Sequence, residues 1–340
     1  MKIIKYLIAL VILNSCNNKD VPKIDEALNC TENWFNAWKL VSKDVFKLEE
    51  QSPVRYVFFD SLYVYTTSPL TGKGGKEING PQLFDENQTW FKKEHKGLII
   101  LPDSSEIKVQ MMIYASPIKE EKVKAYFVMP LLSFWVQQKV DGHGIGLEKL
   151  TAGVFTHEFS HTTQLESFDK FGQYFETYQK KFGAENFGDD MMQNMYEKDT
   201  LIKSTYLKEI KLFENASNSN ESEKIKNTEI ALTSFYDKHK LLLNRDKKDL
   251  KTIDDIWLTM EGVGQYAMYE YFINPKGANL SKSNALKAMK TRWWSQEEGF
   301  AMFQLLAKYK KPQIWAKDFF SADMKTIIEV LEQEIKTTNR

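Results

Sequence analysis

The sequence predicts an α+β protein in which a small β-rich section comes first and a mainly helical region follows. Runs of β-branched and aromatic residues are confined to residues 54–129, whereas apolar residues recur at three- and four-residue steps over most of the chain after Gly146. The chain has 340 residues, of which 42% are hydrophobic, enough for one large or two modest domains. Basic and acidic residues are equal in number, 46 each, so we expect no nucleic-acid partner.

The β-rich section, residues 23–146, is expected to open with one long amphipathic helix. Apolar residues from Ile24 to Phe46 fall on one helical face, and that face is rich in aromatic side chains. Strand candidates follow as β-branched and aromatic runs over residues 54–59, 62–67, 98–101, 109–114 and 125–129. The last of these is either an edge strand that could pair with an extended peptide or an ordinary strand of the sheet.

The helical region, residues 147–340, is predicted from helical periodicity and from the Gly, Asn, Asp and Pro residues between its segments. The expected helices cover residues 147–166, 168–183, 189–217, 222–244, 248–274, 280–291, 295–309 and 322–337. None of these segments has an apolar run long enough to span a membrane.

The first sixteen residues are predicted to direct export and not to join the fold. A short basic region precedes an apolar run from Tyr6 to Leu13, which spans only about 12 Å as a helix, too short to cross a bilayer. The run ends in Leu-Asn-Ser-Cys, which resembles a bacterial lipobox and implies cleavage before Cys16 and lipid on its thiol. Residues 1–15 would then be a lipoprotein signal peptide and residues 16–22 a polar tether. The alternative is an ordinary signal peptide with an incidental cysteine.

The strongest functional signal is the pentad His157-Glu158-Phe159-Ser160-His161. On a helix, residues four apart point about 40° apart, so both imidazoles would project toward one point and could supply two ligands of a zinc ion. Composition alone gives roughly 0.006 such patterns in a chain of this size, so coincidence is a poor explanation. Phe155 and Phe159 would lie on the opposite, core-facing side of this helix. The alternative is that the two histidines are ordinary buried side chains.

A catalytic zinc ion usually has three protein ligands and one open position. Glu261 is the best candidate for the third ligand, because it lies in an otherwise apolar helical stretch where a lone carboxylate is costly unless a cation compensates it. Gly262 and Gly264 beside it would let its helix approach another backbone closely. Glu176 and Glu185 remain alternative third ligands.

The pentad and the segment Trp257-Leu258-Thr259-Met260-Glu261-Gly262 together resemble the gluzincin zinc metallopeptidases, most nearly the aminopeptidase-N-like and thermolysin-like catalytic domains. The resemblance covers roughly residues 147–274. It implies that the zinc ligands are His157, His161 and Glu261 and that the general base is Glu158.

Two departures from the family pattern shape the prediction. The family places its third ligand much closer to the pentad, so we expect a helical insertion over about residues 168–247. The Met-Glu-Asn motif with which the family binds the free amino terminus of a substrate is also absent before the pentad.

These features predict a lipid-anchored zinc peptidase of the bacterial cell envelope, facing the periplasm or the exterior. In the mechanism that the resemblance implies, zinc activates a water molecule and polarises a carbonyl, and Glu158 transfers protons. The expected partners are a peptide or protein substrate and the membrane, reached through the lipid on Cys16. Candidate donors to the oxyanion are Tyr266, Tyr309 and His239. The alternatives are a zinc hydrolase of a non-peptide amide or ester, and a non-catalytic binding lipoprotein with a structural metal site.

Overall fold

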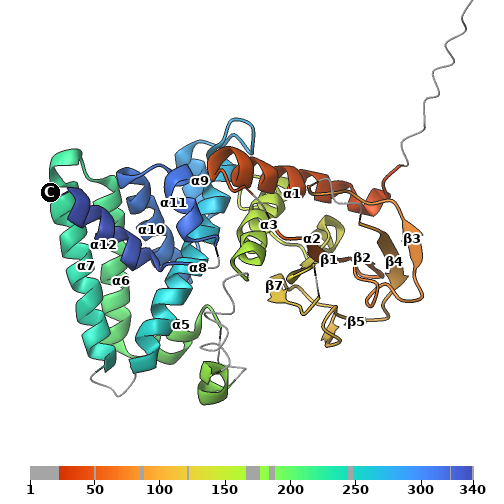
Figure 1. Ribbon diagram of the computed structural model, residues 1–340, viewed down its shortest axis with the longest axis horizontal. Coiled ribbons are helices and arrows are strands. Elements are labelled where there is room, and N and C mark those ends of the chain that lie inside the picture. Colours follow the sequence, from red (N-terminus) through yellow and green to blue (C-terminus); the bar gives the residue numbers. More distant parts are fainter. Residues whose placement is uncertain are drawn as a thin grey trace, which may run out of the picture.

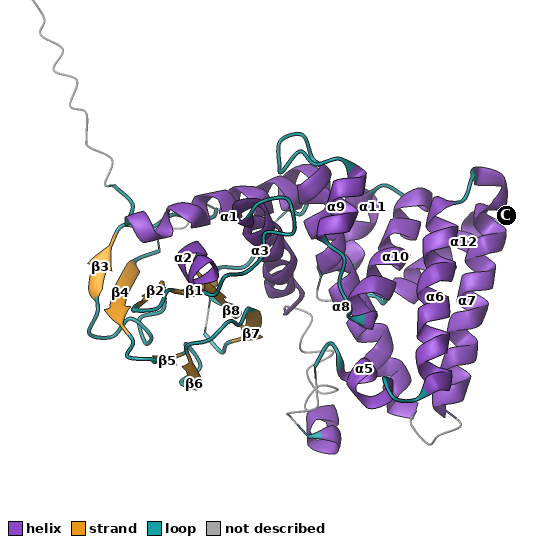
Figure 2. Cartoon of the chain, turned by 180° about the vertical axis from the view of Figure 1, so that it is seen from behind, coloured by secondary structure: helices purple, strands orange, loops and turns teal. Residues whose placement is uncertain are grey.

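The computed structural model describes residues 23–49, 51–84, 88–120, 122–165, 177–183, 188–243, 248–321 and 323–338. Figure 1 shows a sheet-containing part at one end of the molecule, a helical bundle at the other, and helices α3 and α8 between them. All described strands end by Pro130, and the regular structure that follows is helical (Figure 2). The α+β prediction is therefore confirmed. The predicted signal peptide, Cys16 and the tether lie outside the described residues.

The amino-terminal helix is continuous but changes its hydrogen-bonding pattern along its length. It consists of the 3₁₀ turn η1 (Glu26–Leu28), α1 (Asn29–Lys39) and the π-helical η2 (Leu40–Val45). Its buried aromatic face packs on α3 (Leu147–Gln164), where the rings of Trp34 and Phe155 lie 5.8 Å apart, as do those of Trp38 and Phe159. The predicted amphipathic helix is thus confirmed, and it covers the side of α3 that faces away from the histidines.

The described strands form one sheet of six and a separate pair. The six are ordered β3-β4-β2-β1-β8-β7, and the central β1–β8 pairing is parallel while the others are antiparallel. The bounds are β1 Val54–Phe59, β2 Tyr63–Thr66, β3 Lys76–Ile78, β4 Trp90–Glu94, β7 Tyr114–Pro117 and β8 Ala125–Pro130, with β5 Leu98–Ile100 and β6 Glu106–Lys108 as the pair. Phe58 and Phe127 of the two central strands contact the aromatic rings of α1 and α3, so this part of the core lies between the sheet and these two helices.

Two strand predictions are wrong. The strand over residues 125–129 is confirmed as β8, but its interpretation as an edge strand is wrong, because β8 lies between β1 and β7 and all six of its residues are buried. Its continuous apolar run is what burial on both faces requires. Residues 109–114 are not a strand either, since only Tyr114 belongs to β7, which lies at one edge of the sheet while β3 lies at the other. The short strands β3 and β4 are not predicted from the sequence because charged residues interrupt their apolar pattern.

The helices after Gly146 follow the predicted order, although several ends are shifted. The bounds are α3 Leu147–Gln164, α5 Met191–Tyr196, α6 Thr200–Asn218, α7 Glu221–Leu243, α8 Lys248–Ile273, α9 Lys282–Ala288, α10 Trp294–Tyr309, α11 Pro312–Trp315 and α12 Ile327–Thr338. Two further short helices, α2 (Leu132–Gln137) and η5 (Ala316–Asp318), were not expected, and neither was α11. No helix in the described part of the chain is long and apolar enough to cross a membrane.

The single helix predicted over residues 189–217 is wrong, because the chain turns between α5 and α6. The carboxylate of Asp199 accepts hydrogen bonds from the amides of Leu201 and Ile202 and so caps the start of α6. Of the helix predicted over 168–183, residues 177–182 are helical, and residues 168–176 lie outside the described part. The segment expected as an insertion thus contributes α5, α6 and α7, which stand beside α8 and α10 in the bundle (Figure 1).

A buried ion cluster joins four helices of the bundle. The ammonium of Lys238 on α7 lies 2.8 Å from a carboxylate oxygen of Glu209 on α6, 3.1 Å from Asp254 on α8 and 3.2 Å from Glu298 on α10. The four side chains are between 0% and 4% exposed. Burial alone would lower the pKa of Lys238, but the surrounding carboxylates raise it, so the lysine remains charged.

Replacing this lysine by a side chain of similar shape but no charge is expected to weaken the bundle. Lys238→Met would leave several buried carboxylates without a counter-charge and should lower the free energy of unfolding by about 3–5 kcal/mol, measured by urea denaturation. Lys240→Met is the matched control, because Lys240 lies on the same helix but is 71% exposed. This control should cost less than about 1 kcal/mol. Equal stability of the two variants would contradict a role for the cluster in holding the helices together.

Candidate metal centre

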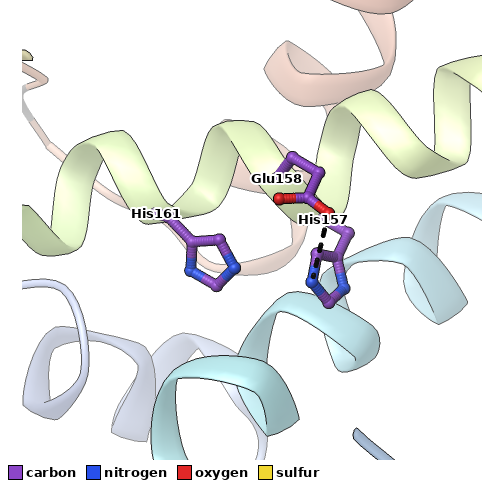
Figure 3. A group of neighbouring side chains, drawn as sticks. All are labelled: His157, Glu158 and His161. Atoms are coloured by element: carbon purple, nitrogen blue, oxygen red, sulfur yellow. Dashed lines mark ion pairs between the residues drawn. The ribbon is translucent and has the colours of Figure 1, made fainter. Parts of the chain in front are cut away.

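Helix α3 presents the pentad residues on the side that faces α8. His157 and His161 project from adjacent turns, and Glu158 lies beside them, as Figure 3 shows. One side-chain nitrogen or oxygen of each residue lies within 4.8 Å of those of the other two. On the other side of the helix, the rings of Phe155 and Phe159 stack 4.9 Å apart in the core. The predicted division of this helix into a histidine side and an aromatic side is confirmed.

Glu261 on α8 completes the group. One of its carboxylate oxygens lies 3.2 Å from Nε2 of His157, and the other lies 3.5 Å from Nε2 of His161. The structure therefore brings the three predicted ligands together from two helices that are far apart in the sequence. The alternative ligands Glu176 and Glu185 lie outside the described residues.

Two glycines of α8 allow this close approach, as expected. A Cβ atom added to Gly264 would lie 3.1 Å from the ring of His157, and one added to Gly262 would lie 2.6 Å from the backbone carbonyl carbon of Gly299 on α10. α8 is therefore held tightly between α3 and α10. Its position fixes the distance between Glu261 and the two imidazoles.

Two glutamine side chains orient the candidate ligands. Nδ1 of His161 donates a hydrogen bond of 2.7 Å to the Gln164 amide oxygen, which leaves the Nε2 lone pair directed at Glu261. The amide of Gln296 on α10 donates to Glu261 at 3.2 Å and in turn accepts from Gln265 at 2.9 Å. Such hydrogen bonds to the groups that hold a metal are what fix ligand orientation in metal sites.

The electrostatics of the group fit a cation. Burial alone would raise the pKa of Glu261, but the two imidazoles lower it, which keeps this carboxylate ionised. Burial lowers the pKa of His161, whereas the nearby carboxylates of Glu261 and Glu158 raise the pKa of His157 against the effect of burial. A metal ion bound by both rings would displace the proton of His157, because a ligating imidazole is neutral. Burial raises the pKa of Glu158 to about 8, and repulsion from Glu261 and Asp189 adds to this rise. A positive charge among these groups would relieve the repulsion.

Unsatisfied buried nitrogens also favour a metal ion. Three ring nitrogens make no hydrogen bond of good geometry with the described residues, although both rings are buried. They are Nδ1 and Nε2 of His157 and Nε2 of His161. Buried polar atoms normally have partners, and unpaired ones call for an explanation such as an ion. Two imidazole nitrogens and one carboxylate form a donor set that suits a divalent transition metal and leaves room for a further ligand.

A cavity of about 520 Å³ opens beside this group. Its walls are the edge strand β7 with the residue before it, the pentad helix, α8 and the turn before α5. The lining residues are Ile113, Tyr114, Ala115, Ser116, Pro117, Glu158, His161, Leu165, Gln179, Gly188, Asp189, Trp257, Met260 and Glu261. Two of the three candidate ligands, His161 and Glu261, therefore face a space large enough for part of a peptide or for a small molecule.

The three candidate oxyanion donors do not line this cavity. Tyr266 packs in the core against Phe46 and Trp315. The hydroxyl of Tyr309 hydrogen-bonds with that of Thr228, and His239 lies 3.3 Å from Asp254 in the buried cluster of the bundle. Sequence reasoning instead missed Asp189 and Gln296, which no local pattern distinguishes from ordinary surface residues.

No known protein family, curated protein or solved structure matches this chain.

Removal of the third candidate ligand should be visible directly in the metal content. Glu261→Ala is expected to reduce the zinc bound per purified chain sharply, because two imidazoles alone form an incomplete site. Glu185→Ala and Glu176→Ala are the comparison variants and should leave zinc content unchanged, as measured by atomic absorption. A loss of zinc in one of these and not in Glu261→Ala would assign the third ligand elsewhere.

The orienting role of Gln164 can be tested by affinity. Gln164→Leu removes the acceptor for Nδ1 of His161 and should weaken zinc binding about 10- to 100-fold in competition with a chromophoric chelator. Gln164→Glu keeps an acceptor in the same place and should not show this loss. If the leucine variant binds zinc as tightly as the parent chain, the hydrogen bond does not set the ligand's orientation.

Proposed function

We propose that the protein is a zinc-dependent peptidase, anchored in the bacterial cell envelope through lipid on Cys16. The observation that carries the proposal is the meeting of His157, His161, Glu261 and Glu158 beside one cavity, which His161, Glu261 and Glu158 line. This is the arrangement that the resemblance to gluzincin metallopeptidases implies. Support for the anchor comes from the lipobox-like ending of the apolar run before Cys16.

Zinc is the metal that this donor set suits best. His157 and His161 supply nitrogens and Glu261 supplies oxygen, and catalytic zinc sites commonly combine two histidines with one glutamate. When bound, zinc supplies a Lewis acid that polarises a carbonyl oxygen and makes water a stronger nucleophile. A structural zinc site usually has four protein ligands and no opening, so the cavity favours catalysis over a purely structural role.

Glu158 is positioned to transfer protons. Its carboxylate lies 4.0 Å from Nε2 of His157, but it is Glu261 and not Glu158 whose two oxygens face the two imidazoles. The Glu158 side chain is 26% exposed. It can therefore reach a water molecule in the cavity, accept a proton from it, and return that proton to the leaving amine nitrogen. His157 and His161 are needed as ligands, which leaves Glu158 as the proton carrier of the pentad.

The edge strand β7 favours a peptide substrate over a compact amide or ester. One side of β7 pairs with β8, and no described strand pairs with its other side. Residues 114–117 also line the cavity. An extended peptide can add to such an edge through main-chain hydrogen bonds, which would lay its backbone along the cavity toward the candidate metal centre.

Replacing Glu158 should abolish catalysis without removing the metal. Glu158→Gln should keep its zinc but lower the cleavage of a peptide library by at least about 100-fold, because it removes the proton acceptor. Glu148→Gln is the matched control on the same helix: Glu148 is exposed and does not line the cavity, so cleavage should be unchanged. Zinc-loaded protein that cleaves no peptide, or a Glu158→Gln variant as active as the parent, would refute the proposal.

A further inference from the structure

Acidic side chains line the cavity beside the candidate metal centre. Glu158, Asp189 and Glu261 line it, and none of the lining residues in the described part of the chain is a lysine or an arginine. The two charges of a divalent ion would balance the two carboxylates of Glu158 and Glu261. The carboxylate of Asp189 is then an excess negative charge.

Asp189 has no side-chain partner among the described residues. It lies in the turn before α5, and its carboxylate makes no hydrogen bond or ion pair with another side chain of the described residues. Burial raises the pKa of this carboxyl to about 7, and repulsion from Glu261 and Asp190 adds to the rise. Partial burial of a carboxylate without a counter-charge among the described residues is unfavourable, so a cation beside Asp189 would lower the free energy of the site.

The chemistry of that cation follows from the number of ligands available. Asp189 offers one carboxylate, and apart from it the cavity's acidic groups are Glu158 and Glu261, which the metal centre already uses. A second metal ion needs several ligands, whereas an ammonium or a guanidinium group needs only one charge-assisted acceptor and room for its hydrocarbon stem. The cavity has that room, and its Leu165 and Met260 side chains offer apolar contact.

We infer that Asp189 binds a positively charged nitrogen of the substrate, close to the bond that is cleaved, and so makes the enzyme prefer cationic peptides. This inference rests on the proposed peptidase function. The nitrogen can be the free α-amine of the peptide or the side chain of a lysine or arginine. Peptides that place a carboxylate at the same point are disfavoured by the same charge.

The test separates binding from cleavage. The zinc-loaded full chain carrying Glu158→Gln is titrated calorimetrically with hexapeptides, each prepared with a free or acetylated amino terminus and with lysine or acetyl-lysine. We expect at least one charged form to bind about tenfold or more tightly than its acetylated form, as for a charge-assisted hydrogen bond. Adding Asp189→Asn should abolish this preference, whereas Asp190→Asn, which changes the neighbouring acid that does not line the cavity, should retain it.

Each result has a defined meaning. A preference confined to the free amino terminus identifies the α-amine as the ligand of Asp189, and one confined to lysine identifies the side chain. Equal binding of charged and acetylated peptides overturns the inference, as does a loss of zinc in Asp189→Asn, which would make Asp189 a metal ligand. Cleavage by the wild-type chain without any charge preference refutes the inference alone. Charge-selective binding without cleavage refutes only the peptidase function.

Discussion

The close packing of α8 between α3 and α10 is the constraint on which the rest of the structure depends. Glycines occupy the contact points: Gly264 faces the ring of His157, Gly262 meets Gly299, and Gly153 of α3 meets the ring of Phe272. A glycine inside a helix costs up to about 1 kcal/mol relative to alanine. Here that cost is offset by contacts that only a missing Cβ permits. Without these contacts, Glu261 would lie too far from the histidines to bind the same metal ion.

The same helix carries two buried carboxylates that are used in different ways. Asp254 faces the bundle, where it pairs with Lys238 and accepts a hydrogen bond from Tyr206. Glu261 faces the pentad two turns later, where its neighbours are imidazoles and an amide. The first carboxylate is part of a closed group with its own cation, which suits a structural role. The second lies beside a cavity and has no lysine or arginine partner in the described part of the chain, which suits an exchangeable cation.

The parts of the site that the sequence predicts are those that depend on local spacing. His157, Glu158 and His161 share one helix, so a four-residue step is enough to place them together. Glu261 could be predicted because a lone carboxylate in an apolar helix conflicts with its surroundings. The general architecture could also be predicted, since helical and strand periodicities are separated along the chain.

The remaining features depend on how distant segments pack. The sequence offers strand candidates over residues 109–114 and 125–129, and only the packing of the sheet decides that β8 is internal and that the edge strand β7 begins at Tyr114. Asp189 and Gln296 are polar residues outside any motif, and they gain their positions from the turn before α5 and from the α8–α10 contact. No spacing along the chain encodes these contacts.

The meeting of His161 and Glu261 also has a consequence for the unfolded chain. These residues flank the whole segment that forms α5, α6 and α7, so an ion held by both would act as a crosslink that closes a very long loop. Closing such a loop removes conformational entropy from the denatured chain, as a disulfide bond does. The free energy of binding the ion would then also be free energy of folding for the entire bundle.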